Sequence, residues 1–253
     1  MKVIFLGTGT STGVPVIACK CAVCHSIDQR DHRLRSSVYI ETDQTKIVID
    51  TGPDFRIQML SQRLTDIDAV VFTHNHKDHT GGLDDIRPIN FINKKVIDVY
   101  AEEYVQNTLR MEYPYIFVDQ DYPGVPQIKL HKIDDTPFRV GDLDIIPIRV
   151  MHKNLPVLGY RIGDFTYITD ANYIAPEELK KIKGSKYLVL NALRKETHYS
   201  HFSLSEALEI VDIIQPEQAF LTHISHNMGF YDEVQRSLPE NVLLAYDGLS
   251  LNV

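Results

Sequence analysis

The stretch FTHNHKDHTGG, residues 72–82, constrains the chain more than any other. It follows an apolar run and places His74, His76, Asp78 and His79 within six residues. Imidazole and carboxylate groups bind zinc, manganese or iron. A loop that follows a strand can turn several such groups toward one point, and the two glycines that end the stretch allow close backbone approach before the next helix. The pattern predicts a metal site at the end of a strand.

Four more candidate side chains end apolar, β-rich runs. IVIDTG carries Asp50, IPIRVMH ends on His152, FTYITD on Asp170 and QAFLTH on His223. Singly, each of these could be a turn residue. Together with the first cluster they offer two sets of three ligands and a carboxylate able to bridge them. Two metal ions about 3.5–4 Å apart that share a hydroxide form a hydrolytic centre.

Short β-rich runs recur along the chain, and helical patterns lie between some of them. The clearest helix is expected at residues 203–215, with Ser203 or Ser205 as its cap, and a shorter one at 176–184. DAVVFTHNH and EQAFLTHISH resemble each other, which suggests related halves whose strand ends meet. We expect packed sheets covered by helices, in one domain over residues 1–253.

The order HxHxDH, later His, Asp and final His resembles the metallo-β-lactamase superfamily over essentially the whole chain, and TKIVIDTG matches its first motif. The resemblance implies an αββα sandwich with the site along one edge, between two sheets. It also implies that Asp50 orients the ligand loop through hydrogen bonds rather than binding metal. The implied ligands are His74, His76 and His152 for one metal ion and Asp78, His79 and His223 for the other, with Asp170 as the bridge. The ions would be manganese or zinc, with iron as a further possibility.

All three cysteines, Cys19, Cys21 and Cys24, lie in ACKCAVCH. They could be a metal site short of one ligand, a redox device or simply unpaired thiols. A redox device needs a thiol with a lowered pKa and a resolving partner. A structural zinc needs four nitrogen or sulfur ligands. The candidates for the fourth ligand are His25, His32 and His226.

CKCAVC together with THISH resembles the phosphodiesterases of the carbon–phosphorus lyase pathway, which open five-membered cyclic phosphates of phosphorylated ribose. The pyrroloquinoline-quinone biosynthesis branch shares a similar cysteine motif. The resemblance implies a structural zinc held by Cys19, Cys21, Cys24 and His226, which would clamp an N-terminal loop over the active-site edge. It implies a small phosphate-ester substrate, of the phosphoribosyl cyclic phosphate or cyclic nucleotide type.

Phosphodiester hydrolysis needs a proton for the leaving alkoxide, and THYSHFSLSEAL offers His198 and His201. SHFSLSEAL resembles the segment that carries the general acid of those phosphodiesterases. We therefore assign His201, together with the metal ligand Asp78, to catalysis: a hydroxide bridging the metals attacks phosphorus and His201 protonates the leaving group. Alternatively, His201 positions a substrate oxygen, or both histidines are surface residues.

Composition separates the remaining alternatives. A formal charge of −8 argues against a non-specific nucleic-acid binder, and no long basic insertion resembles the substrate arm of a ribonuclease Z-like nuclease. An ester, thioester or lactam hydrolase and a non-catalytic partner in quinone biosynthesis stay open. Contacts of substrate with Arg87 or with the Gly7–Gly13 loop stay open too.

Three clustered cysteines are not a disulfide framework, and the apolar run near the N-terminus spans five residues, which is short for a signal peptide. We expect a cytoplasmic protein without a membrane segment. Homodimers are common among the proteins that the chain resembles, so a homodimer is a further possibility.

Overall fold

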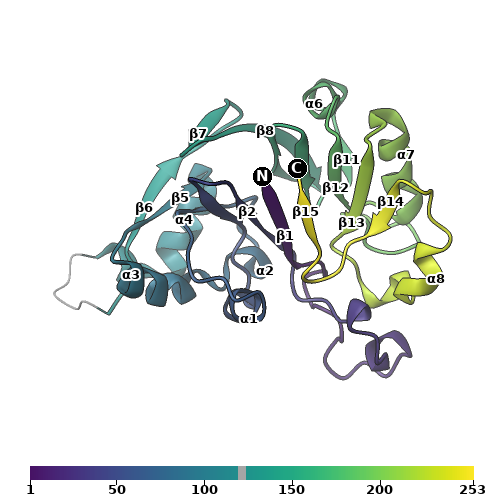
Figure 1. The fold of residues 1–253 in the computed structure, drawn as a ribbon, viewed down its shortest axis with the longest axis horizontal. Coiled ribbons are helices and arrows are strands. Elements are labelled where there is room, and N and C mark those ends of the chain that lie inside the picture. Colours follow the sequence, from purple (N-terminus) through teal and green to yellow (C-terminus); the bar gives the residue numbers. More distant parts are fainter. Residues whose placement is uncertain (119–123) are drawn as a thin grey trace.

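Two β-sheets pack face to face, and helices lie on their outer sides (Figure 1). The computed structural model describes residues 1–118 and 124–253. The first sheet contains, in spatial order, β15 (Ser250–Asn252), β1 (Lys2–Gly7), β2 (Ser37–Glu41), β3 (Lys46–Ile49), β4 (Ala69–Val71), β5 (Ile97–Ala101) and β6 (Ile128–Lys132). Strands β3 to β6 run parallel, as expected where helices connect strands.

The second sheet is built by the C-terminal half of the chain. It contains, in spatial order, β11 (Tyr173–Ile174), β8 (Leu143–His152), β9 (Leu155–Ile162), β10 (Phe165–Ile168), β12 (Tyr187–Asn191), β13 (Gln218–Thr222) and β14 (Val242–Leu244), with β7 (Phe138–Val140) paired to β8. Strands β10, β12, β13 and β14 are parallel, so their carboxyl ends lie at one edge.

Helices associated with the first sheet precede those of the second in the sequence. They are α1 (Phe55–Ser61), α2 (Lys77–Thr80), α3 (Arg87–Asn93), α4 (Glu103–Glu112) and α5 (Pro114–Phe117), then α6 (Pro176–Ile182), α7 (Leu204–Ile214) and α8 (Tyr231–Gln235). The 3-10 turns in the described part of the chain are η1 (Val23–His25), η2 (Gln29–Asp31), η3 (Leu83–Ile86) and η4 (His226–Met228). Helix α7 begins with the predicted cap, a reciprocal pair between Ser203 and Glu206.

The two sheets share a buried apolar layer, which makes them one domain. Phe5 of β1 and Phe220 of β13 are fully buried, and their ring centroids lie 5.6 Å apart. Separate apolar clusters fill the space between each sheet and its helices. The αββα sandwich expected from the sequence is confirmed. Within the described residues, no helix is long and apolar enough to cross a membrane.

One expected strand differs in the structure. Residues 160–170 form the end of β9 and all of β10 rather than a single strand. Gly163 has φ +58° and turns the chain between them. The turn matters for the site, because it brings the end of β10, and with it Asp170, to the edge where β12 and β13 also end.

Candidate metal centre and active site

The predicted ligands gather where strands of both sheets end. His74 follows β4, and Asp78 and His79 lie in α2 directly after it. His152 is the last residue of β8. Asp170 follows β10 and His223 follows β13. The two similar stretches around His74 and His223 thus lie in different sheets, and their strand ends meet.

Asp170 lies at the centre of the cluster. Three triplets of side chains each hold their ligand atoms within 4.8 Å of one another, and Asp170 belongs to all three. The triplets are His74, His76 and Asp170; His79, Asp170 and His223; and His152, Asp170 and His201. A carboxylate shared in this way is placed as a bridge between two ions would be.

The remaining predicted ligands are close by. The His152 ring lies 5.1 Å from that of His76, and Asp78 Oδ2 lies 3.2 Å from His79 Nε2. All seven predicted ligands are thus brought together, although His152 groups more tightly with His201 than with His74 and His76. The division of ligands between two ions stays a prediction.

Three site residues adopt a backbone conformation that is unusual for residues other than glycine. Asp50, Asp170 and His223 have φ of 65°, 55° and 56°, each within two residues of the end of a strand. Asp, Asn and His enter this left-handed region more readily than other side chains, and strain of this kind clusters at functional sites. The sharp turn lets each strand end aim its side chain into the cluster.

The buried nitrogens of the cluster fit bound cations. His74 Nε2 and His79 Nε2 are buried and have no hydrogen-bond partner within the described residues. His79 Nδ1 lies 2.7 Å from Asp50 Oδ2, so one ring nitrogen faces Asp50 and Nε2 faces the cluster. That nitrogen lies 3.2 and 3.3 Å from oxygens of Asp78 and Asp170. A ring nitrogen and carboxylate oxygens at such distances need positive charge between them, a proton or a metal ion.

Electrostatics lead to the same conclusion. Burial opposes protonation of His79, but the carboxylates of Asp78, Asp170 and Asp50 outweigh it and hold its pKa well above the usual range. Burial lowers the pKa of His74 and His152, and lowers that of His223 to about 3. Neutral imidazole is the form that binds metal. The residues therefore fit divalent metal ions.

Hydrogen bonds hold the ligands in place. Asp50 is fully buried; it accepts from Thr73 N (2.9 Å) and Thr73 Oγ1 (2.8 Å) and lies against His79. This is the orienting contact expected of it. His152 Nδ1 lies 2.8 Å from the Ser200 carbonyl. His223 lies 3.2 Å from both Ser36 Oγ and Thr10 Oγ1. The sequence did not predict that these ligands would be oriented by Thr73, Ser200, Ser36 and Thr10. Its one local hint was that a Thr precedes the ligand His at two strand ends.

The ligand loop is packed against the turn that follows Asp50. A Cβ on Gly82 would lie 2.1 Å from Gly52 O, and one on Gly52 would lie 2.1 Å from Asp78 O. Only glycine fits at such approaches. The expectation of close backbone approach after the ligand loop is thus met at Gly82.

His201 lies beside the shared carboxylate. Its Nε2 is 3.3 Å from Asp170 Oδ2, and its ring stacks on His223 with centroids 4.8 Å apart. Its other nitrogen lies 3.0 Å from Ser200 Oγ and 3.3 Å from His198 Nδ1. The side chain is 11% exposed, so it can meet both the cluster and a bound molecule.

A cavity of about 350 Å³ opens over the cluster. Its lining consists of Thr10, Ser11, His76, Asp78, His152, Asp170, Leu193, His198, Tyr199, Ser200 and His201. The Gly7–Gly13 loop therefore reaches the site through Thr10 and Ser11. Arg87 does not line this cavity; its guanidinium pairs with Asp84 at 2.6 Å, one turn away, and donates to the Gly124 carbonyl.

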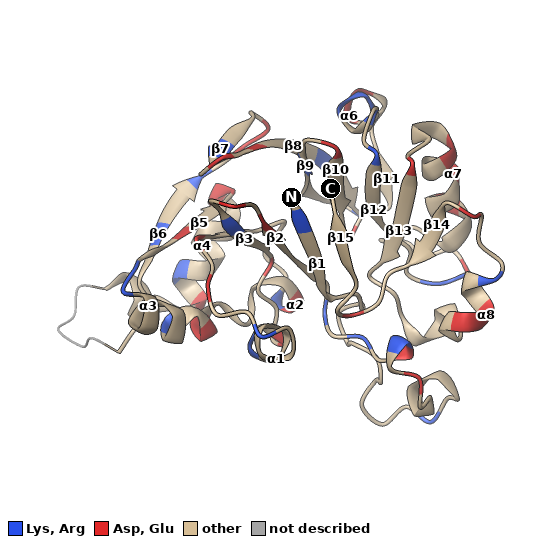
Figure 2. Ribbon diagram, in the orientation of Figure 1, with Lys and Arg blue, Asp and Glu red and all other residues tan. Residues whose placement is uncertain are grey.

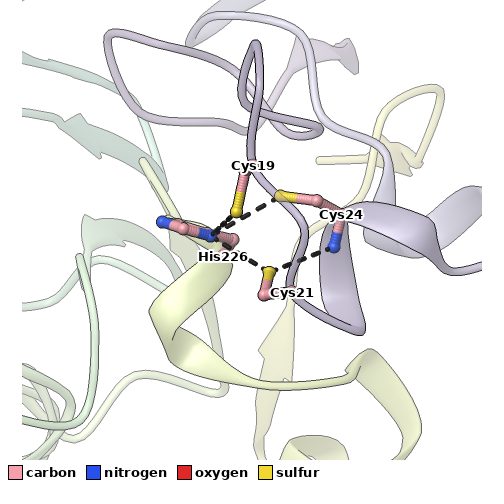
Figure 3. Close-up of side chains that lie close together, drawn as sticks. All are labelled: Cys19, Cys21, Cys24 and His226. Atoms are coloured by element: carbon pink, nitrogen blue, oxygen red, sulfur yellow. Dashed lines mark hydrogen bonds between the residues drawn. The ribbon is translucent and has the colours of Figure 1, made fainter.

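The three cysteines surround one histidine from the far end of the chain (Figure 3). The His226 Nδ1 lies 3.3, 3.2 and 3.5 Å from the sulfurs of Cys19, Cys21 and Cys24. A tetrahedral zinc with Zn–S of about 2.3 Å and Zn–N of about 2.0 Å separates its ligands by roughly 3.6 Å. The cluster therefore fits a CxCxxC zinc site completed by His226.

The other two candidate histidines point elsewhere. His25 Nδ1 lies 3.0 Å from the Cys21 carbonyl and His32 Nε2 lies 2.9 Å from the Ser26 carbonyl. The Cys24 backbone N–H and His226 lower the pKa of the Cys21 thiol to about 6, which favours the thiolate that a metal binds.

The cysteine loop joins the rest of the protein next to the metal cluster. Thr10 N donates to the Ile224 carbonyl, and Ile224 N donates to the Thr8 carbonyl, directly after the ligand His223. Farther along, the Tyr231 N–H donates to Asp31 (2.7 Å), which ties the loop to α8 (Figure 1). A metal held between the cysteines and His226 would therefore stabilise the loop that carries His223.

Comparisons with known proteins agree with this geometry. A beta-lactamase superfamily domain matches residues 45–224. The structure resembles the crystal structure of a diphosphatase from the PhnP family, with a TM-score of 0.93 and 36% identity over 100% of this chain and 97% of the other. Zn²⁺-bound PqqB from Methylobacterium extorquens shares the fold, with a TM-score of 0.81, 18% identity and full coverage of both chains.

A curated relative, an octanoyltransferase of Porphyromonas gingivalis, is 42% identical over 252 residues, which is 98% of this chain and 51% of the relative. This chain thus spans about half the length of that protein.

The fold and the clustered ligands define a candidate metal-binding domain. The chain belongs to the beta-lactamase superfamily and, within it, to the PhnP family.

Proposed function

We propose that this chain is a dinuclear-metal phosphodiesterase that acts on small phosphate esters, cyclic ribose phosphates and cyclic nucleotides among them. The observation that carries the proposal is the position of His201. It lies 3.3 Å from the carboxylate shared by the ligand triplets and also lines the cavity. An alkoxide that leaves a phosphodiester needs a proton, and a proton donor for it has to lie between the metal cluster and the cavity.

The cluster residues would hold the two ions as the sequence predicts, with Asp170 between them. When bound, divalent ions supply a water with a pKa near neutrality and neutralise charge that develops on phosphate oxygens. The chain itself orients His201. Ser200 contacts one ring nitrogen of His201, and the other nitrogen faces the cavity and Asp170. His201 then donates its proton to the leaving oxygen.

The family and the charge distribution support a small phosphate substrate. The PhnP-family relative of known structure is a diphosphatase. Lys and Arg are interspersed with Asp and Glu over both halves of the fold (Figure 2), and the chain carries a formal charge of −8. A long nucleic acid would need a basic track for its phosphates. The cysteines gather around His226 rather than in disulfides, which supports a cytoplasmic location.

A second candidate is acyl ester or thioester hydrolysis, which the octanoyltransferase relative favours. An octanoyl chain would need an apolar channel. Leu193 is the one aliphatic side chain among those lining the cavity, and most of the others are polar or ionisable. The transferase also has about half its length outside the match. The cavity chemistry favours phosphate.

The test is a substrate panel. Protein stripped of metal and reloaded with manganese or zinc is given bis(p-nitrophenyl) phosphate, p-nitrophenyl octanoate, an octanoyl thioester and a β-lactam. We expect turnover of the phosphodiester to exceed that of the others, followed by turnover of cyclic ribose phosphates. Preferred turnover of the octanoyl compounds would move the assignment to acyl hydrolysis.

A further inference from the structure

An exposed tyrosine stands at the mouth of the cavity. Tyr199 follows β12 in the loop that also carries His198 and His201, and its side chain lines the cavity although 70% of the residue is exposed. Exposed aromatic rings are common singly on protein surfaces. This one lies beside the candidate general acid, where the part of a substrate that does not react would be bound.

A lysine from another element lies over that ring. Lys153 forms the tight turn between β8 and β9, directly after the ligand His152, and its ammonium lies 5.1 Å from the centre of the Tyr199 ring. Within the described residues Lys153 has no ion pair with a carboxylate. Its charge is therefore available to an anion, and Tyr199 beside it stays 70% exposed.

Both residues are fixed by one asparagine. The Lys153 N–H donates to Asn172 Oδ1 (2.7 Å), and Asn172 Nδ2 donates to the Tyr199 carbonyl (3.4 Å). Tyr199 also packs against the His198 ring, with centroids 4.4 Å apart. The backbones that carry the ring and the ammonium are thus tied together before any substrate binds, and a preformed site loses less entropy on binding.

An aromatic face next to an unpaired cation suits a planar group attached to a phosphate. Aromatic side chains stack with any of the nucleobases, and one such contact strengthens binding on the order of five- to 100-fold. An ammonium near the ring attracts phosphate oxygens. A sugar phosphate without a base could bind to the lysine but would have no group to stack on the ring.

Building on the proposed phosphodiesterase function, we propose that Tyr199 and Lys153 form a subsite for a nucleobase and its phosphate, so that the preferred substrates are nucleoside phosphodiesters. Tyr199 stacks with the base, and Lys153 binds a phosphate oxygen between the base and the metal cluster.

The test compares thymidine 5′-(p-nitrophenyl phosphate) with methyl p-nitrophenyl phosphate, which share the reacting group and leaving group but differ in the base. For wild-type protein we expect a higher kcat/KM on the thymidine ester. Tyr199→Leu should reduce the ratio of the two kcat/KM values about fivefold or more, and Tyr199→Phe should keep it. The matched control is Tyr173→Leu, since Tyr173 is 53% exposed on β11 and does not line the cavity. An unchanged ratio in Tyr199→Leu overturns the proposal.

A binding measurement separates this proposal from the proposed function. Calorimetry on the metal-loaded protein compares thymidine 5′-monophosphate, thymidine and ribose 5-phosphate. We expect the nucleotide to bind more tightly than ribose 5-phosphate, and Tyr199→Leu to remove that difference in affinity. Lys153→Gln should weaken the binding of the nucleotide several-fold more than the binding of thymidine. If wild type hydrolyses neither ester, the phosphodiesterase assignment fails and this measurement alone decides the subsite. Equal affinity for the nucleotide and ribose 5-phosphate would overturn it.

Discussion

His201 and Asp170 meet 3.3 Å apart, Nε2 to Oδ2, at the point where the ligand triplets join. Both residues line the cavity, and His201 is the more exposed of the two. The pair therefore connects the metal cluster with the space for substrate. The same proximity gives His201 two possible roles, proton donor or metal ligand, and they predict different properties for a variant.

His201→Ala should retain both active-site metals and lose about 10²- to 10⁴-fold in kcat on alkyl phosphodiesters. The loss should be least with p-nitrophenyl leaving groups, which depart without a proton. Metal content and a leaving-group series check this, with His131→Ala as control, because His131 pairs with Asp98 on β5 away from the cavity. Loss of metal would make His201 a ligand, and full activity on alkyl esters would remove it from the mechanism.

Asp50→Asn should lower the affinity for active-site metal about 10- to 100-fold. The substitution removes the charge that faces His79 Nδ1 at 2.7 Å and weakens the hydrogen bonds from Thr73. Competition with a chelator measures the affinity. Asp164→Asn is the matched control, since Asp164 lies in the β9–β10 turn and pairs with Lys186. Equal metal affinity in the two variants would show that Asp50 does not orient the ligands.

His226→Ala should remove one zinc equivalent per chain and expose residues 10–35 to proteolysis. If the site contributes about 2 kcal/mol, Tm falls by about 4–8 °C at this chain length. His25→Ala should change neither zinc content nor Tm, because His25 faces a carbonyl rather than the thiols. The redox interpretation of the cysteines would regain support if zinc content were the same in wild type and His226→Ala.

Asp247 should make stability depend on pH. Burial raises the pKa of its carboxyl to about 6, although Leu34 N–H and Thr8 donate to it. The folded state then binds a proton more tightly than the unfolded chain, whose Asp titrates near 4. This group's contribution to the unfolding free energy therefore falls as pH rises from about 4 to about 6 and is constant above.

Wild type and Asp247→Asn are compared by denaturant unfolding from pH 5 to 7, and effects of metal ligands cancel in the difference. The stability of wild type relative to the variant should decrease with pH up to about 6. A difference that stays flat over that range would mean that the pKa of Asp247 is not raised in the folded protein.

The fold was predictable because its signals are local. Apolar runs marked most of the parallel strands, and Ser203 with Glu206 marked the start of α7. The β9–β10 turn at Gly163 was missed, because Tyr160 to Asp170 reads as one continuous β-rich run. Very short edge strands such as β11, with two residues, carry too little pattern to detect.

The residues of the site also differ in how well the sequence predicts them. Ligands at strand ends stand out because four of them share one loop. The groups that orient them do not, since Ser36 meets His223 across 187 residues and no local pattern links the two. The choice among His25, His32 and His226 also depended on distance in space: His226 is 202 residues from Cys24 in the chain, yet its Nδ1 lies 3.5 Å from the Cys24 sulfur.

The most direct test of a dinuclear phosphodiesterase is a metal titration of activity. Protein that keeps its cysteine-bound zinc but lacks active-site metal is given manganese in steps, and bis(p-nitrophenyl) phosphate hydrolysis is followed. We expect activity to reach its plateau at two added ions per chain. A plateau at one ion, or no phosphodiester turnover at full occupancy, would contradict it.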